Sequence, residues 1–163
     1  MVKYRRGDEV KRIVLCLAIL FLVGCTAGNE IKHSDIDATT KELKQTFTTI
    51  KDVEVQYFLE QIEWIVTWKN TPTEQEAQAA FQVIQATVQS SNFSEDIVEV
   101  LVSEHTLKTY PDVVLFYDFE QNDTYDQRYS SAYDTSQRGY TKWYWSEKND
   151  GDSLEVNEKD VMK

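Results

Sequence analysis

The side chains that could carry acid–base chemistry are few and scattered. The sequence has only two histidines, His33 and His105. It contains neither the HExxH pattern of zinc hydrolases nor the GxSxG, P-loop or Gly-rich patterns that place a nucleophile or hold a phosphate. Carboxylates are plentiful, which leaves a carboxylate-dependent hydrolase as an alternative, but abundance alone does not perturb a pKa. We therefore expect a protein that is not an enzyme, with no catalytic residue and no cofactor.

Acidic residues at two places suggest calcium binding as the next chemistry to consider. The first place comprises Asp118, Glu120, Asp123 and Asp126, and the second is the stretch 149–152, NDGD. Neither fits the EF-hand loop, which needs a central Gly and a Glu at its twelfth position. We interpret both as solvated loops and expect no metal site.

Cys25 is the residue whose surroundings are most distinctive. It follows the apolar run 13–23, which is too short to span a bilayer, since spanning takes roughly 20 residues. Residues 1–12 carry five basic and two acidic side chains, which is typical of the segment before the apolar part of a signal peptide. The pattern predicts export and removal of residues 1–24 as a signal peptide.

The tetrad Leu22-Val23-Gly24-Cys25 resembles the lipobox of bacterial lipoproteins. The resemblance implies that the Cys25 thiol is joined to diacylglycerol and that the lipoprotein signal peptidase cuts between Gly24 and Cys25. Further acyl chains such as palmitate would matter, because one chain alone binds a membrane only marginally. We expect a lipid anchor on the extracytoplasmic face of the cell membrane, in a host that the short tether suggests is Gram-positive. An ordinary secretory cut and an uncleaved anchor helix are the alternatives.

The charge of the part after the signal peptide limits its partners. The sequence has 17 Lys and Arg and 28 Asp and Glu, of which five and two precede residue 25, so residues 25–163 carry a net charge of about −14. This charge argues against nucleic acid and against anionic lipid surfaces as partners. Cys25 is the only cysteine left in this part, so a disulfide within the chain is excluded and its stability must come from the core.

Apolar spacing predicts helices in the first half of the domain. Ser34 is a suitable N-cap, and the following stripe continues past Asp52, so we expect a broad helical face up to residue 68. The residues of this stripe are Leu43, Phe47, Ile50, Val55, Leu59, Ile62 and Val66. Thr73 and Glu76 then form a capping box, which predicts a second helix packed antiparallel to the first. Residues 94–109 are ambiguous, with the cap favouring a helix and the β-branched residues a strand.

The second half of the chain predicts strands at 113–119, 127–134 and 140–146, with turns at 121–123 and 137–139. The expected fold class is α+β, with two or three N-terminal helices followed by a small antiparallel β-meander. We expect residues 25–34 to form a lipidated tether, residues 35–150 a single globular domain, and residues 151–163 an acidic, frayed tail.

Aromatic side chains make up the candidate binding surface. Seven of the nine tyrosines lie between residues 110 and 144. Such amphipathic rings are common in protein interfaces and in platforms that stack sugars, although a core position is the alternative for the two tryptophans. The candidates are Tyr125, Tyr129, Tyr133, Trp143 and Trp145.

These observations favour a non-enzymatic, membrane-anchored surface lipoprotein that binds a protein or cell-wall partner through its C-terminal half. The expected order of elements, helices followed by a meander, also resembles that of the cystatin-like small lipoproteins of Gram-positive bacteria. This resemblance implies an accessory or exclusion role for a conjugative element. A third interpretation concerns residues 17–24, LAILFLVG, which resemble the peptide pheromones that enterococci release from lipoprotein signal sequences.

Overall fold

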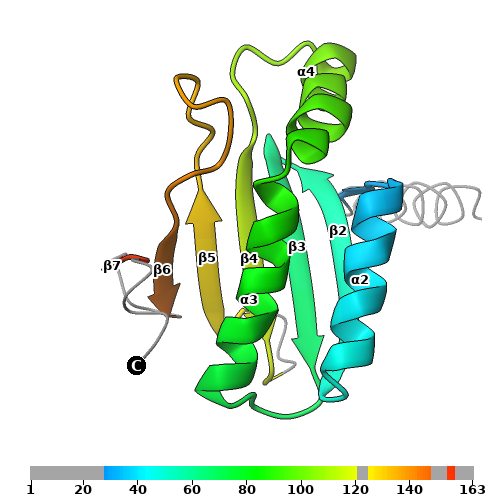
Figure 1. Cartoon of the computed structure of the whole chain (residues 1–163), viewed down its shortest axis with the longest axis vertical. Coiled ribbons are helices and arrows are strands. Elements are labelled where there is room, and N and C mark those ends of the chain that lie inside the picture. Colours follow the sequence, from blue (N-terminus) through cyan, green and yellow to red (C-terminus); the bar gives the residue numbers. More distant parts are fainter. Residues whose placement is uncertain (1–27, 121–124, 148–153, 157–163) are drawn as a thin grey trace, which may run out of the picture.

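A seven-stranded mixed β-sheet forms the frame of the protein (Figure 1), whose computed structural model describes residues 28–120, 125–147 and 154–156. The strands lie in the order in which they occur in the chain, and every neighbouring pair is antiparallel except β3 and β4, which are parallel. Their bounds are β1 Asn29–Glu30, β2 Ile50–Phe58, β3 Gln61–Trp68, β4 Asp112–Asp118, β5 Gln127–Ser131, β6 Tyr144–Glu147 and β7 Leu154–Glu155.

Two helices cover one face of this sheet and run in opposite directions (Figure 1). They are α2, Ser34–Thr46, which precedes the first long strand, and α3, Glu74–Val88, which follows the hairpin. A π-helical segment, η1 (Phe93–Val98), leads directly into α4 (Glu99–His105) at one end of the sheet. Of the ambiguous stretch 94–109, the residues up to His105 are helical, and the Thr73–Glu76 capping box is confirmed.

The helix expected to reach residue 68 ends at Thr46, and residues 50–68 form a β-hairpin instead. The side chains of this hairpin alternate with a period of two, so that every second one is buried under the helices. The turn has only two residues, Leu59 and Glu60, and both have positive φ angles, 47° and 63°, as a type I′ turn requires. The buried apolar set comprises Ile50, Val53, Val55, Tyr57, Ile62, Trp64, Val66 and Trp68.

The expected fold class is therefore wrong, because helices and strands are interleaved instead of forming two successive blocks. The order of elements places α3, η1 and α4 between β3 and β4. A long connection of this kind is what two parallel neighbouring strands need, since a short turn cannot reverse the chain twice. The predicted strands do pair antiparallel, as β4, β5 and β6, but they belong to a larger mixed sheet. Within the described residues, its one parallel pair, β3 and β4, is joined by the helical crossover.

The last strands are shorter than the sequence predicted. The strand expected over 127–134 ends at Ser131, and the one expected over 140–146 begins only at Tyr144. Between them the chain makes an isolated bridge from Asp134 to Gly139. Tyr140 is buried, and its hydroxyl donates to the carbonyl of Pro111 at 2.7 Å, so it packs as a core residue instead of pairing in a ladder.

Large aromatic side chains dominate the core between the helices and the sheet. Trp64, Trp68 and Trp143 are each at most 1% exposed. The Tyr117 hydroxyl donates a 2.7 Å hydrogen bond to the Ala77 carbonyl, which fixes the start of α3 above β4. The position of α3 over the sheet is thus set by both apolar packing and a buried polar contact.

Several predicted features lie wholly or partly outside the described residues. These are the signal peptide, the Gly24–Cys25 cleavage site, the turn at 121–123 and the acidic stretch 149–152. Of the expected tether, Asn29 and Glu30 form β1, which pairs with Tyr57 and Gln56 of β2. Of the expected frayed tail, Leu154 and Glu155 pair with β6 as β7.

Candidate functional site

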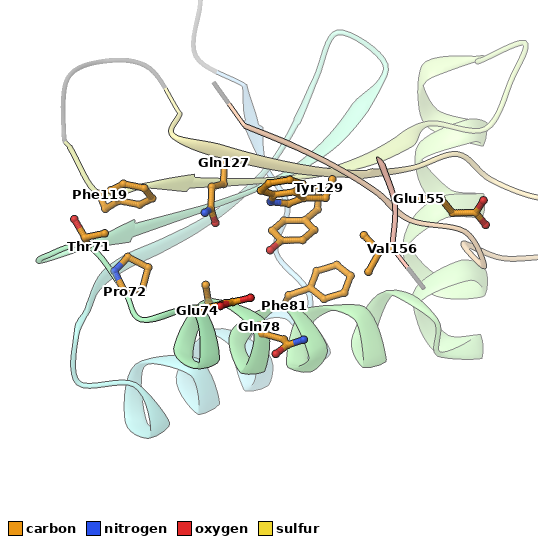
Figure 2. Close-up of a pocket in the computed structure, with 12 residues that line it drawn as sticks. Thr71, Pro72, Glu74, Gln78, Phe81, Phe119, Gln127, Tyr129, Glu155 and Val156 are labelled. Atoms are coloured by element: carbon orange, nitrogen blue, oxygen red, sulfur yellow. The ribbon is translucent and has the colours of Figure 1, made fainter. Parts of the chain in front are cut away.

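A hollow of about 400 Å³ lies between the first half of α3 and the strands β5 and β6 (Figure 2). Pockets of this size that combine aromatic walls with a few polar groups are the usual form of a binding site for a small molecule or a side chain. Its lining comprises Thr71, Pro72, Glu74, Ala77, Gln78, Phe81, Phe119, Gln127, Tyr129, Trp145, Glu155 and Val156.

The capping box at the start of α3 fixes the helical wall of this pocket. The Thr73 side chain accepts a hydrogen bond from the Glu76 backbone N–H at 3.2 Å, and a Glu76 carboxylate oxygen accepts from the Thr73 N–H at 2.9 Å. These contacts satisfy two of the backbone donors that a helix start leaves unpaired. Glu74, the first helical residue, is thereby held at the mouth of the pocket, where the helix dipole favours a negative charge.

Stacked rings form the inner surface of the pocket. The rings of Tyr129 and Phe81 are stacked, with centroids 4.5 Å apart and planes inclined by 23°. Behind them, Trp143 meets Phe81 edge to face at 5.3 Å, and Tyr117 meets Tyr129 at 5.6 Å. Because the rings behind are fully buried, the side chains that face the pocket rest on a closely packed support.

Three polar groups point into the space between the strands and the helix. Figure 2 shows Gln127 and Tyr129 directed from β5 towards α3, and Glu74 directed back towards them. Gln127 Oε1 is buried and has no hydrogen-bond partner within the described part of the chain. Burial raises the pKa of Tyr129 to about 12, and the negative charge of Glu74 adds to this shift. The phenol is therefore protonated at neutral pH and can donate or accept a hydrogen bond.

The pocket has a negative electrostatic character. The described lining residues include two carboxylates, Glu74 and Glu155, and no Lys, Arg or His. Figure 2 shows Glu155 at one rim with its carboxylate turned outward, so Glu74 is the charge closest to the aromatic surface. The site suits a ligand that brings hydrogen-bond donors, and it offers no positive group to an anion.

The five candidate aromatics lie in separate places. Tyr129 and Trp145 line the pocket, while Trp143 is buried beneath it and is only 1% exposed. Tyr133 stacks on Tyr110, with ring centroids 4.1 Å apart, beside a different hollow, and Tyr125 packs on Phe116 of β4. The structure thus brings together two of the five candidates.

The residues that complete the site carry little sequence signal of their own. Phe81 and Glu74 belong to α3, some 50 residues before Tyr129, and were interpreted as part of an ordinary amphipathic helix. Gln127 had no distinguishing pattern. The capping box was the one local sequence signal for this site, because it places Glu74 at the first position of the helix.

The other candidate groups have structural roles. The His33 ring accepts a hydrogen bond from the Asp35 N–H at the start of α2, and the His105 ring stacks on Tyr57. A carboxylate oxygen of Asp126 accepts from the N–H groups of Phe119 and Glu120 at 2.8 and 3.0 Å, which holds the connection after β4. Across residues 28–120, 125–147 and 154–156, no cluster of three or more His, Cys, Asp or Glu side chains could hold a metal ion.

Within those same ranges, none of the helices has the length and apolar character needed to cross a bilayer.

Comparison with known proteins yielded no match among protein-family models, curated proteins or solved structures.

Proposed function

We propose that the protein is a non-enzymatic, lipid-anchored surface lipoprotein that binds a partner in the pocket between α3, β5 and β6. The lipobox-like tetrad ending in Cys25 supports the anchor. The observation that carries the binding role is the pocket itself, where Tyr129 and Trp145 line a space that also contains Gln127 Oε1, which has no hydrogen-bond partner among the described residues. A buried acceptor without a partner costs about 1–3 kcal/mol, which a bound donor would recover.

The path of the chain supports a pocket directed away from the membrane. Asn29 pairs with Tyr57, two residues before the β2–β3 turn, so the chain enters the domain at the turn end of the hairpin (Figure 1). Cys25 stands only four residues earlier, a reach of roughly 14 Å at full extension. The pocket begins at Thr71, beyond the opposite end of β3. An anchor at Cys25 would therefore leave the pocket facing outward.

The anchor is tested by expressing the full-length chain beside Cys25→Ala and measuring the mass of each product and its distribution between membrane and medium. The proposal predicts a diacylglycerol-modified, membrane-bound protein that starts at Cys25. An unmodified parent protein, or membrane retention of Cys25→Ala equal to that of the parent, would contradict it.

The binding role is tested on intact cells with a photo-crosslinking amino acid in place of Gln78 at the pocket or Glu54 on β2. We expect a discrete adduct only from position 78. The adduct should be lost in Trp145→Ala and kept in Tyr144→Ala, because Tyr144 is the neighbouring residue and is 37% exposed. Equal adducts from both positions, or loss in both variants, would argue against a specific pocket.

A further inference from the structure

We propose that the group bound in this pocket is a basic side chain, Lys or Arg, from a partner protein. This inference rests on the proposed binding function and deepens it by naming the chemistry of the ligand. It follows from three features of the pocket that act together: its hydrogen-bond acceptors, its aromatic walls and the sign of its charge.

The polar groups of the pocket favour a ligand that donates hydrogen bonds. Gln127 Oε1 is buried and has no partner in the part of the chain that the structure describes, and Glu74 brings a carboxylate that accepts only. The two groups lie on opposite walls and point towards the same space (Figure 2). An ammonium group offers three donors and a guanidinium five, so either can bridge the two walls. A carboxylate or phosphate would leave Gln127 Oε1 unsatisfied and would face Glu74 as a like charge.

The aromatic walls suit the rest of a basic side chain. Phe81, Phe119, Tyr129 and Trp145 all line the hollow. A cation held over the face of such rings is attracted by their quadrupole, and the attraction is greatest where water is excluded. The methylene stem of Lys or Arg would meanwhile pack against apolar surface. Rings, carboxylate and amide together form the kind of cage that binds cations.

The negative charge of the pocket favours a basic side chain over a neutral ligand. A sugar could stack on Trp145 and donate hydrogen bonds to Gln127 and Glu74, but a neutral ligand would leave the negative charge of Glu74 uncompensated. The described lining residues include no positive group to neutralise Glu74, and the chain after residue 24 has a net charge of about −14. Long-range attraction and the local pocket therefore both favour a cation.

The test uses the full-length lipidated protein in lipid nanodiscs and short capped peptides that differ at one central residue. The central residues are Lys, Arg, norleucine and Nε-acetyl-lysine, and a neutral disaccharide serves as the sugar probe. Binding is followed by tryptophan fluorescence and by nuclear magnetic resonance. We expect the Lys and Arg peptides to bind about tenfold more tightly than the norleucine and acetyl-lysine peptides, with a difference that shrinks as salt is added.

Matched variants assign the effect to the pocket. Glu74→Gln should lower affinity for the Lys peptide about fivefold or more and leave norleucine binding unchanged, whereas Glu54→Gln, an exposed carboxylate on β2, should change neither. Equal binding of Lys and acetyl-lysine, or tighter binding of the disaccharide that Trp145→Ala abolishes, would overturn the inference and leave the pocket function standing. No binding of any probe, together with no adduct from position 78, would overturn both.

Discussion

Tyr129 of β5 lies stacked on Phe81 of α3, with ring centroids 4.5 Å apart. These residues are 48 positions apart in the chain, and their contact closes the inner end of the pocket while joining sheet to helix. Because one side of the Tyr129 ring is used for packing and its hydroxyl lies near Glu74, its ionisation should couple the stability of the fold to pH.

The first prediction concerns unfolding at alkaline pH. The folded-state pKa of Tyr129 is raised to about 12 by burial and by Glu74, whereas an unfolded tyrosine ionises near 10. The protonated Tyr129 phenol therefore makes its full contribution to the free energy of unfolding below about pH 10. This contribution is lost as pH rises towards 12, at up to about 1.4 kcal/mol per pH unit. Buried Tyr117, whose pKa is also raised by burial, should add to the loss.

The measurement is urea unfolding of the parent and of Tyr129→Phe at several pH values from 8 to 12. The variant should lose less free energy of unfolding over this interval than the parent, since phenylalanine cannot ionise. In Glu74→Gln the loss should end at a lower pH and be smaller in total, because the charge that helps to raise the folded-state pKa has been removed. Parallel profiles for parent and Tyr129→Phe would show that this phenol does not govern alkaline unfolding.

The second prediction separates the two neighbouring tryptophans. Trp143 is 1% exposed and packs edge to face on Phe81, so Trp143→Ala should destabilise the fold by roughly 3–5 kcal/mol. Trp145 is only partly buried and lines the pocket, so Trp145→Ala should cost markedly less and act mainly on binding. Urea unfolding of both variants, with the pocket crosslink as a second readout, distinguishes them. Equal loss of stability would mean that Trp145 is also a core residue.

The third prediction concerns the β2–β3 turn. Leu59 and Glu60 both have positive φ, a conformation that costs residues other than Gly, Asn and Asp free energy, and Leu59 is also 78% exposed. The double substitution Leu59→Asn with Glu60→Gly should raise the free energy of unfolding by about 1 kcal/mol. Glu104→Gly, in the helix α4, is the control and should lower it by a similar amount. A double variant no more stable than the parent would contradict the strain argument.

The same turn explains why the hairpin was not predicted. Val55, Leu59, Ile62 and Val66 match a helical spacing, and no Asn-Gly or similar pair marked a turn between them. Leu59, counted as part of an apolar helical face, is the most exposed large hydrophobic residue of the described chain. Two periodicities fitted the same residues, and tertiary packing on the sheet decided between them.

Local signals were more dependable than long-range ones. The capping box depends on residues three apart, Thr73 and Glu76, and it was found from the sequence. The strand β4 was found because its apolar run is buried in the middle of the sheet. The pairing of β3 with β4 and the meeting of Phe81 with Tyr129 depend on residues about 50 apart, and nothing in the local sequence encodes either.

The fourth prediction tests the capping box as a support of the pocket. Thr73→Ala removes the acceptor for the Glu76 N–H and should destabilise the fold by about 1 kcal/mol. The Thr73 contacts also lower the pKa of Glu76, so they stabilise most above the ordinary carboxyl pKa and are lost as pH falls. The cost of Thr73→Ala should therefore shrink in acid.

The control is Thr48→Ala, an exposed threonine in the connection between α2 and β2, which should change stability by less than about 0.5 kcal/mol. Urea unfolding at pH 7 and pH 3 measures both variants. Because the cap also fixes Glu74, Thr73→Ala should weaken binding of the Lys peptide, although Thr73 itself is not among the residues that line the pocket. Thr73→Ala could instead lose the expected free energy of unfolding, about 1 kcal/mol at pH 7, and still bind the Lys peptide as tightly as the parent. That result would show that packing of Ala77 and Phe81 on the sheet, and not the cap, holds the first turn of α3 at the pocket.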